Sequence, residues 1–140
     1  CALPICLEGL MSEEHNPILG DTPINTLKKN KPIFFQRNLE SAIAISRHHG
    51  VKVLVPTWAY SSKMADFMST RHYQFGVKEQ NELIRSLEAQ PSVWIYDFTR
   101  DMPDNPLYWV DGRHVNEKGA RKKAELIARY IQNKQILDSD

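Results

Sequence analysis

One stretch of this chain, residues 32–56, most constrains what it can fold into, because a helical pattern there leads directly into an apolar strand. From Pro32 onward, apolar and small residues recur every three or four positions, as on one face of a helix: Phe35, Leu39, Ala42, Ile43 and Ser46. Gly50 ends the pattern, and residues 51–56 (VKVLVP) then form a short, β-branched run typical of a buried strand. A helix, a glycine and an apolar strand in this order indicate an α/β protein with a parallel sheet.

The same order recurs along the rest of the chain. A second helix is predicted over residues 77–89, and the residues expected on one face of it are Val77, Gln80, Asn81, Ile84 and Leu87. Residues 93–97 (VWIYD) predict the next strand, because Pro91 ends the helix before them. A last helix is predicted from Asn116, a favourable N-cap residue, to about residue 132, with an apolar stripe of Ala120, Ala124, Ile127, Ala128 and Ile131.

Loops occupy the remaining stretches. Prolines and glycines interrupt every pattern in residues 1–31, which predicts an irregular loop or linker with at most one short helix. Residues 57–75 predict a loop rich in aromatic and hydroxyl groups at the carboxyl end of the first strand, where open α/β sheets bind ligands. Residues 102–110 predict a turn-rich loop. The domain is therefore expected over residues 32–135, with residues 136–140 as a tail.

Composition narrows the class of protein. The formal net charge is +1, which implies no general attraction to nucleic acid or to acidic membranes. The basic run over residues 121–123 is interpreted as the solvated side of the last helix, so no nucleic-acid partner is predicted. The chain has no apolar run of the roughly 18 residues that a membrane-spanning helix needs.

The amino-terminal end leaves the compartment open. Cys1 and Cys6 do not have the spacing of a zinc or redox motif; we interpret them as free thiols, with a disulfide as the alternative. No signal peptide is visible. Because the chain opens on cysteine and not on methionine, we expect a fragment or a processed form.

The strongest chemical signal is the stretch Asp111-Gly112-Arg113-His114. An acid lies three residues before a histidine, and the histidine precedes the start of the last helix. A carboxylate beside an imidazole orients the ring and stabilises its cationic form, which is how a general base is often held. This loop should also lie at the carboxyl edge of the sheet, so the pattern predicts a catalytic role for His114.

The surrounding residues resemble the SGNH (GDSL-type) hydrolases. The most specific part of the resemblance is a block of five residues: Asp111, His114, Asn116, Gly119 and Ala120. Residues 75–77, Asn81 and residues 94–97 also look like that family's penultimate helix and strand. The resemblance covers most of residues 32–132. It implies a three-layer α/β/α, flavodoxin-like fold, of which this chain covers roughly the C-terminal half. It also implies that His114 is the general base and Asp111 its orienting acid.

The family's other catalytic blocks are absent from this sequence. No Gly-Asp-Ser-Leu-like nucleophile block and no Gly-x-Asn-Asp block occur; nor does the Gly-x-Ser-x-Gly elbow of other hydrolases. The nearest match, residues 20–23 (GDTP), has threonine in place of serine, lacks a preceding strand and carries a proline where a helix should start. Thr22 is therefore not expected to be catalytic. The resemblance implies that the nucleophile and oxyanion-hole residues lie upstream of this chain.

Other residues are weaker candidates. Trp58 and Tyr60 either cap the core or form a substrate wall beside the base. His72 is expected to pack or to be exposed, and His15, His48 and His49 to be exposed. A metal site would combine Asp111 and His114 with Asp97 or Asp101, but no metal-binding motif supports it.

Three functional hypotheses follow. The first is an ester hydrolase acting on an acylated small molecule, lipid or sugar, with no cofactor, and with the chain's own missing N-terminal half as a partner. The second is a truncated or degenerate SGNH-like module that binds a partner or a carbohydrate without catalysis. The third is a receiver-type or flavodoxin-like domain, which would need acidic residues after a first strand and a phosphate-binding loop.

Overall fold

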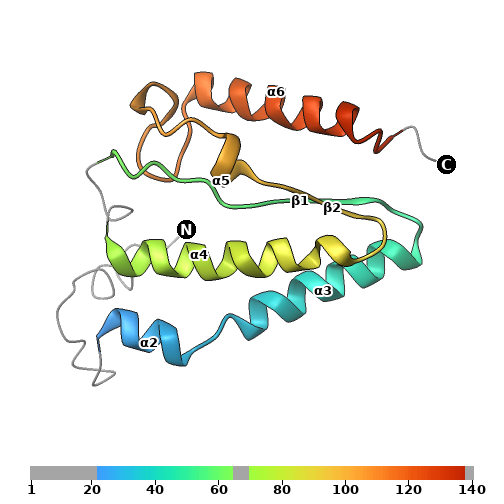
Figure 1. The fold of residues 1–140 in the computed structure, drawn as a ribbon, viewed down its shortest axis with the longest axis horizontal. Coiled ribbons are helices and arrows are strands. Elements are labelled where there is room, and N and C mark those ends of the chain that lie inside the picture. The colour runs from blue at the N-terminus through green and yellow to red at the C-terminus, as the bar shows by residue number, and fades with distance from the viewer. Residues whose placement is uncertain (1–21, 65–69, 138–140) are drawn as a thin grey trace, which may run out of the picture.

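The computed structural model describes residues 22–64 and 70–137 of the chain (Figure 1). In chain order, the elements are α2 (Pro23–Lys29), α3 (Ile33–His48), β1 (Val53–Pro56), α4 (Arg71–Ser86), β2 (Val93–Tyr96), α5 (Phe98–Asp101) and α6 (Glu117–Asn133). Two 3₁₀ turns, Leu87–Ala89 and Pro106–Tyr108, lie after α4 and before α6. The cysteines, His15 and Gly20-Asp21 of the sequence analysis lie outside the described residues.

The two strands pair in parallel, with Val53 opposite Val93 and Pro56 opposite Tyr96. Helix α4 connects them, because parallel neighbours need a crossover. Figure 1 shows α3 and α4 on one side of the strands and α6 on the other. The predicted α/β class with parallel strands is therefore confirmed.

Alternation along the strands creates two apolar clusters. Val53, Val55, Val93 and Ile95 contribute to the cluster beneath α3 and α4, whose most buried members are Ile43 and Ile84. Leu54 and Tyr96, which point to the opposite face, contribute to a second cluster with Phe98, Met102 and Trp109 and with the inner face of α6. Successive strand residues point to opposite faces of a sheet, so each face acquires its own core.

Helix α4 begins at Arg71, six residues earlier than predicted, and its last turn is 3₁₀. The loop predicted over residues 57–75 is correspondingly shorter. His72 is buried within the first turn of the helix, and Gly76 approaches Leu27 of α2. Aromatic residues have weak helix propensity, but packing against α2 outweighs that preference in the first turns of α4.

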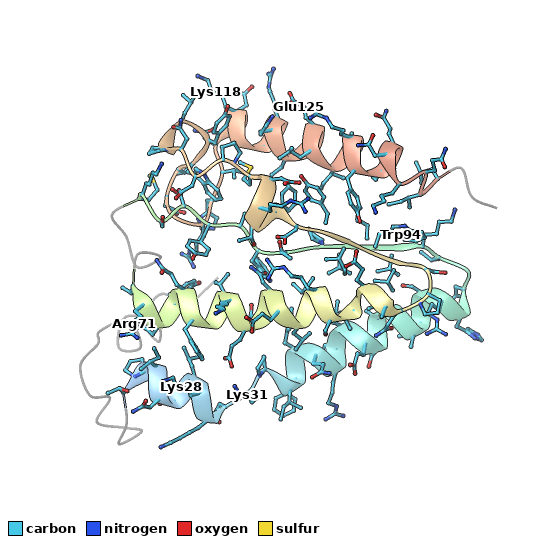
Figure 2. The ribbon with its side chains drawn as sticks, in the orientation of Figure 1. Lys28, Lys31, Arg71, Trp94, Lys118 and Glu125 are labelled. Atoms are coloured by element: carbon cyan, nitrogen blue, oxygen red, sulfur yellow. The ribbon has the colours of Figure 1, made fainter. Side chains whose placement is uncertain are left out.

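The apolar stripe predicted for α6 is wrong for its alanines. Ala120, Ala124 and Ala128 are exposed, and the residues that face the body are Gly119, Lys123, Leu126, Ile127 and Tyr130. Tyr130 donates a hydrogen bond from its hydroxyl to the carbonyl of Ile95 at 2.8 Å. Large side chains bury more apolar area than alanines and so set the inner face. Figure 2 shows Lys118 and Glu125 on the outer side of α6.

Segments on both sides of the predicted domain, residues 32–135, pack against it. Helix α2, inside the predicted irregular region, packs on α4, and Lys31 pairs with Glu79 of α4 at 2.7 Å. At the other end, Ile136 of the predicted tail is buried, and its carbonyl accepts a hydrogen bond from Lys52 Nζ at 2.8 Å. Both segments belong to the packed body. None of the helices in the described ranges combines the length and the apolar character needed to cross a lipid bilayer.

Candidate active site

The predicted acid and base lie at the tip of a closed loop between the turn Pro106–Tyr108 and α6. An isolated antiparallel bridge joins Trp109 to Val115, and the amide of Val110 donates to the carbonyl of His114 at 2.7 Å. Trp109 is buried, and its indole N–H donates to the carbonyl of Pro103 at 2.9 Å. The base of the loop is therefore fixed, and its tip carries the functional groups.

The carboxylate of Asp111 organises the tip. Its Oδ1 accepts hydrogen bonds from the backbone amides of Arg113 and His114, both at 2.7 Å. Its Oδ2 lies 2.7 Å from Nδ1 of His114. One side chain thus fixes both the turn of the backbone and the orientation of the imidazole, as aspartate does in turns of this kind.

These contacts determine the protonation of the Asp111 carboxyl and of the His114 ring nitrogens. The hydrogen bond from His114 lowers the pKa of Asp111 from 3.8 to about 2; partial burial opposes the shift, and the two backbone amides add to it. Near neutral pH, the carboxylate is ionised and can only accept hydrogen bonds, so Nδ1 of His114 is the donor. In a neutral imidazole, Nε2 is then the acceptor. Nε2 makes no hydrogen bond within the part of the chain that the structure describes.

Helix α6 is anchored directly behind the pair. Asn116 caps the helix by accepting from the amide of Gly119 at 3.0 Å, and its Nδ2 donates to the carbonyl of Leu107 at 2.8 Å. A Cβ on Gly119 would lie only 2.1 Å from the carbonyl oxygen of Tyr108. Glycine is therefore required where the helix meets the preceding turn, and the Asn116–Gly119 pattern has a physical reason.

The loop after β1 holds the tip from the other side. The amide of Ser61 donates to the carbonyl of Gly112 at 2.9 Å. The Ser61 side chain is fully buried, and its hydroxyl donates to Asp104 at 2.6 Å. Burial alone would raise the pKa of Asp104, but hydrogen bonds from Ser61 and Ser62 outweigh it and lower that pKa. The ionised carboxylate therefore anchors the loop.

The start of that loop is fixed by a buried amide on α4. Asn81 accepts from the amide of Trp58 at 2.7 Å, and its Nδ2 donates to the Trp58 carbonyl at 2.9 Å and to Thr99 Oγ1 at 3.0 Å. Asn81 is 2% exposed, so an unmade hydrogen bond here would be costly. The side chain gives the backbone of Trp58 the two partners that a neighbouring strand would give.

The carboxylate of Asp97 links three elements of the fold. Asp97 accepts from Thr57 Oγ1 at 2.9 Å and from Nε and Nη2 of Arg85 at 2.9 and 3.1 Å. Burial alone would raise the pKa of Asp97, but the hydrogen bonds and charge of Arg85, together with the bond from Thr57, lower it. Asp97 is therefore committed to holding β1, α4 and the end of β2 together.

The two predicted substrate residues line different cavities. Trp58 is 57% exposed and lines a largely apolar cavity of about 360 Å³ with Arg113 and Lys123. Tyr60 instead lines a cavity of about 460 Å³ between α2 and α4. The structure thus places Trp58 in one cavity with the neighbour of His114, whereas Tyr60 faces a separate one.

The remaining candidates have structural surroundings. Thr22 caps α2 through the amide of Asn25 at 3.4 Å, and His48 and His49 are exposed as predicted. Asp101 is paired with Arg100 at 2.7 Å, and Asp97 is held by Arg85. Among residues 22–64 and 70–137, no group of three His, Cys, Asp or Glu side chains is placed to hold a metal ion.

Sequence reasoning did not assign roles to Ser61, Asn81 or Asp104. For Asn81 a signal was present, because a polar amide on the otherwise apolar inner face of a helix needs a buried partner. Ser61 and Asp104 carried no such signal, since each lies in a predicted loop and not on the apolar face of a helix or strand.

Comparisons of the chain with protein-family models, with curated proteins and with solved structures each found no match. The functional argument accordingly depends on the residues of the site and on their geometry.

Proposed function

We propose that this chain supplies the general base and its orienting acid for ester hydrolysis, as the C-terminal part of an SGNH-type hydrolase. The observation that carries the proposal is the 2.7 Å contact between Nδ1 of His114 and Oδ2 of Asp111. A donor at Nδ1 leaves Nε2 to take the proton of an attacking serine, and Asp111 then stabilises the imidazolium. Such acyl transfer needs no cofactor. The substrate class is an acylated small molecule, lipid or sugar.

The attacking serine belongs, in this proposal, to polypeptide outside the chain. A nucleophile must lie within hydrogen-bond reach of its base. Ser61 and Ser62 of the loop after β1 do not meet this condition, because both donate to Asp104, at 2.6 and 2.8 Å.

Among residues 22–64 and 70–137, β1 pairs only with β2, and its other, open edge is the place where that polypeptide would join the sheet. The amides of Val53 and Thr57 donate to β2, so the backbone of Leu54 points the other way. The cavity beside Trp58 is lined by Val55 of β1 and by residues from both sides of the sheet, including Phe35, Ile84, Phe98 and Lys123. It therefore runs along this open edge. Strands added from this edge would extend the sheet toward a three-layer, flavodoxin-like domain.

Hydrogen exchange tests the strand addition. In the isolated chain, the amide of Leu54 should exchange faster than those of Val53 and Val55, which face β2. In the natural polypeptide that contains this chain and the proposed upstream half, the amide of Leu54 should become protected. An unchanged exchange rate at Leu54 would contradict pairing at this edge.

Hydrolysis of p-nitrophenyl esters by that natural polypeptide tests the function. The His114→Ala variant should lose activity by at least about 10³-fold while its melting temperature stays near that of the wild type. His48→Ala, the same change at an exposed histidine of α3, is the matched control and should retain full activity. Hydrolysis that survives His114→Ala would overturn the proposal.

The second candidate, a non-catalytic binding module, is favoured by one observation: Ser61 and Ser62 in the loop after β1 are engaged by Asp104. It predicts that no natural form of the polypeptide hydrolyses esters. It also predicts that His114→Ala leaves the binding of a partner or a carbohydrate unchanged.

A further inference from the structure

The contacts around loop 57–61 suggest how the acid–base pair is kept in place. We propose that Asn81 and Ser61 are positioning residues for the Asp111–His114 pair and act through the backbone of loop 57–61. This inference rests on the proposed function of the pair and adds the residues that set its geometry.

Two contacts hold loop 57–61 in place, and the first is made by Asn81. Its side chain bonds both backbone polar groups of Trp58, and Thr99 satisfies its remaining donor. The Thr99 hydroxyl in turn lies within hydrogen-bond distance of the Trp58 carbonyl, at 3.1 Å. A buried amide with three bonds has one orientation, because any rotation would leave polar groups unpaired. The peptide of Trp58 is therefore fixed relative to α4.

The second contact is made by Ser61, which lies three residues after Trp58 in the same loop. Its hydroxyl is tied to Asp104 at 2.6 Å, so its backbone amide has a fixed direction. That amide donates to the carbonyl of Gly112 at 2.9 Å. Gly112 is buried, although Arg113 and His114 beside it are exposed. The contact thus fixes the one buried residue between the acid and the base.

The position of Gly112 matters because the contacts of Asp111 are all local. The carboxylate reaches the amides of Arg113 and His114 and the imidazole only while residues 111–114 keep their tight turn. Releasing the carbonyl of Gly112 lets that turn open. Misplacement of a catalytic group by about 1 Å can cost a rate of order 10²-fold.

A purely structural role for Ser61 would change the stability of the protein and leave the pair unaltered. The distinguishing measurement is the titration of the Asp111 side-chain carboxyl by ¹³C NMR in the 140-residue chain. The wild type should titrate with a pKa of about 2, whereas Ser61→Ala and Asn81→Ala should move the pKa toward 3.8. Ser86→Ala is the matched control, since its hydroxyl bonds only to Leu83 within its own helix turn.

A double-variant comparison sharpens the test. Ser61→Ala and Asp104→Ala break the same hydrogen bond, so the double variant should shift the Asp111 titration no further than the larger single shift. If Asn81→Ala does not fold, Ser61→Ala decides the matter alone. An Asp111 titration that stays at about 2 in folded Ser61→Ala overturns the positioning role. The readout needs no ester hydrolysis, so this failure is separate from failure of the proposed function.

Discussion

Asp97 and Asp111 both have lowered pKa values and several hydrogen bonds, yet their surroundings differ. Asp97 contacts Thr57 and Arg85, which lie 40 and 12 residues away, and its side chain is 24% exposed. Within the described residues, the hydrogen-bond partners of Asp111 all lie within three residues of it, and the ring that it holds is 65% exposed. The first connects distant elements, and the second shapes one loop.

We infer from this difference that Asp97 stabilises the fold, whereas Asp111 serves the proposed function by orienting His114. Charged hydrogen bonds between distant, partly buried groups hold a fold together. An exposed pair three residues apart contributes little to the free energy of unfolding, because solvent screens it and the loop already brings it together. The elaborate contacts of Asp111 are therefore better explained by the orientation of His114 than by stability.

The largest expected effect distinguishes the two carboxylates by activity. Asp111→Asn should lower ester hydrolysis by the natural polypeptide by about 10² to 10⁴-fold, because the amide favours the wrong imidazole tautomer. The free energy of unfolding should change by less than about 1 kcal/mol. Activity assays and urea unfolding of the same preparation check both statements. A variant that hydrolyses esters at the wild-type rate would remove Asp111 from the mechanism.

Removing the other carboxylate, that of Asp97, should lower the stability of the fold. Asp97→Ala removes the partner of Arg85 and Thr57 and should destabilise the fold by about 2 to 3 kcal/mol. Urea unfolding measures this loss. If Asp97→Ala proved no more destabilising than Asp111→Ala, the contrast between the two sites would not hold.

A third prediction concerns the support behind the loop. Gly119→Ala places a methyl group against the carbonyl of Tyr108 and should destabilise the protein by about 1 to 3 kcal/mol. Ala120→Gly, at an exposed neighbouring position, is the control for helix propensity alone and should cost about 1 kcal/mol. If Gly119→Ala instead stabilised the protein by about as much as Ala120→Gly destabilises it, helix propensity alone would explain both variants and the close approach to Tyr108 would have no energetic consequence.

The pH dependence of stability gives a smaller effect. The pKa of Asp111 is lowered from 3.8 to about 2, so its contribution is present above 3.8 and is lost as the pH falls through about 2. The difference in unfolding free energy between wild type and Asp111→Asn should thus shrink between about pH 5 and pH 2. A difference that grows on acidification would have the wrong sign.

The smallest expected effect concerns Trp58, whose ring is largely exposed although its backbone is held by Asn81. Trp58→Ala should change the free energy of unfolding by less than about 0.5 kcal/mol. If the ring forms a substrate wall, KM should rise while kcat stays the same. An unchanged KM would leave Trp58 without a role in binding.

Whether a contact could be predicted from the sequence depended on how far apart its two residues lie along the chain. The Asp111–His114 pair and the Asn116 cap were predictable, because both are formed within three residues. The contacts of Asn81 with Trp58 and of Ser61 with Gly112 were not, because they join separate elements. The start of α4 at Arg71 was missed for the same reason, since α2 helps to define it. Local chemistry fixes the pair, and tertiary packing fixes its support.

The most direct test of the central claim is the tautomer of His114, measured by ¹⁵N NMR of the imidazole near neutral pH. If Asp111 orients His114 as a general base, the neutral ring should carry its proton on Nδ1 and leave Nε2 unprotonated. Asp111→Asn should reverse or mix this preference. A neutral ring that is protonated on Nε2 in the wild-type chain would contradict the account.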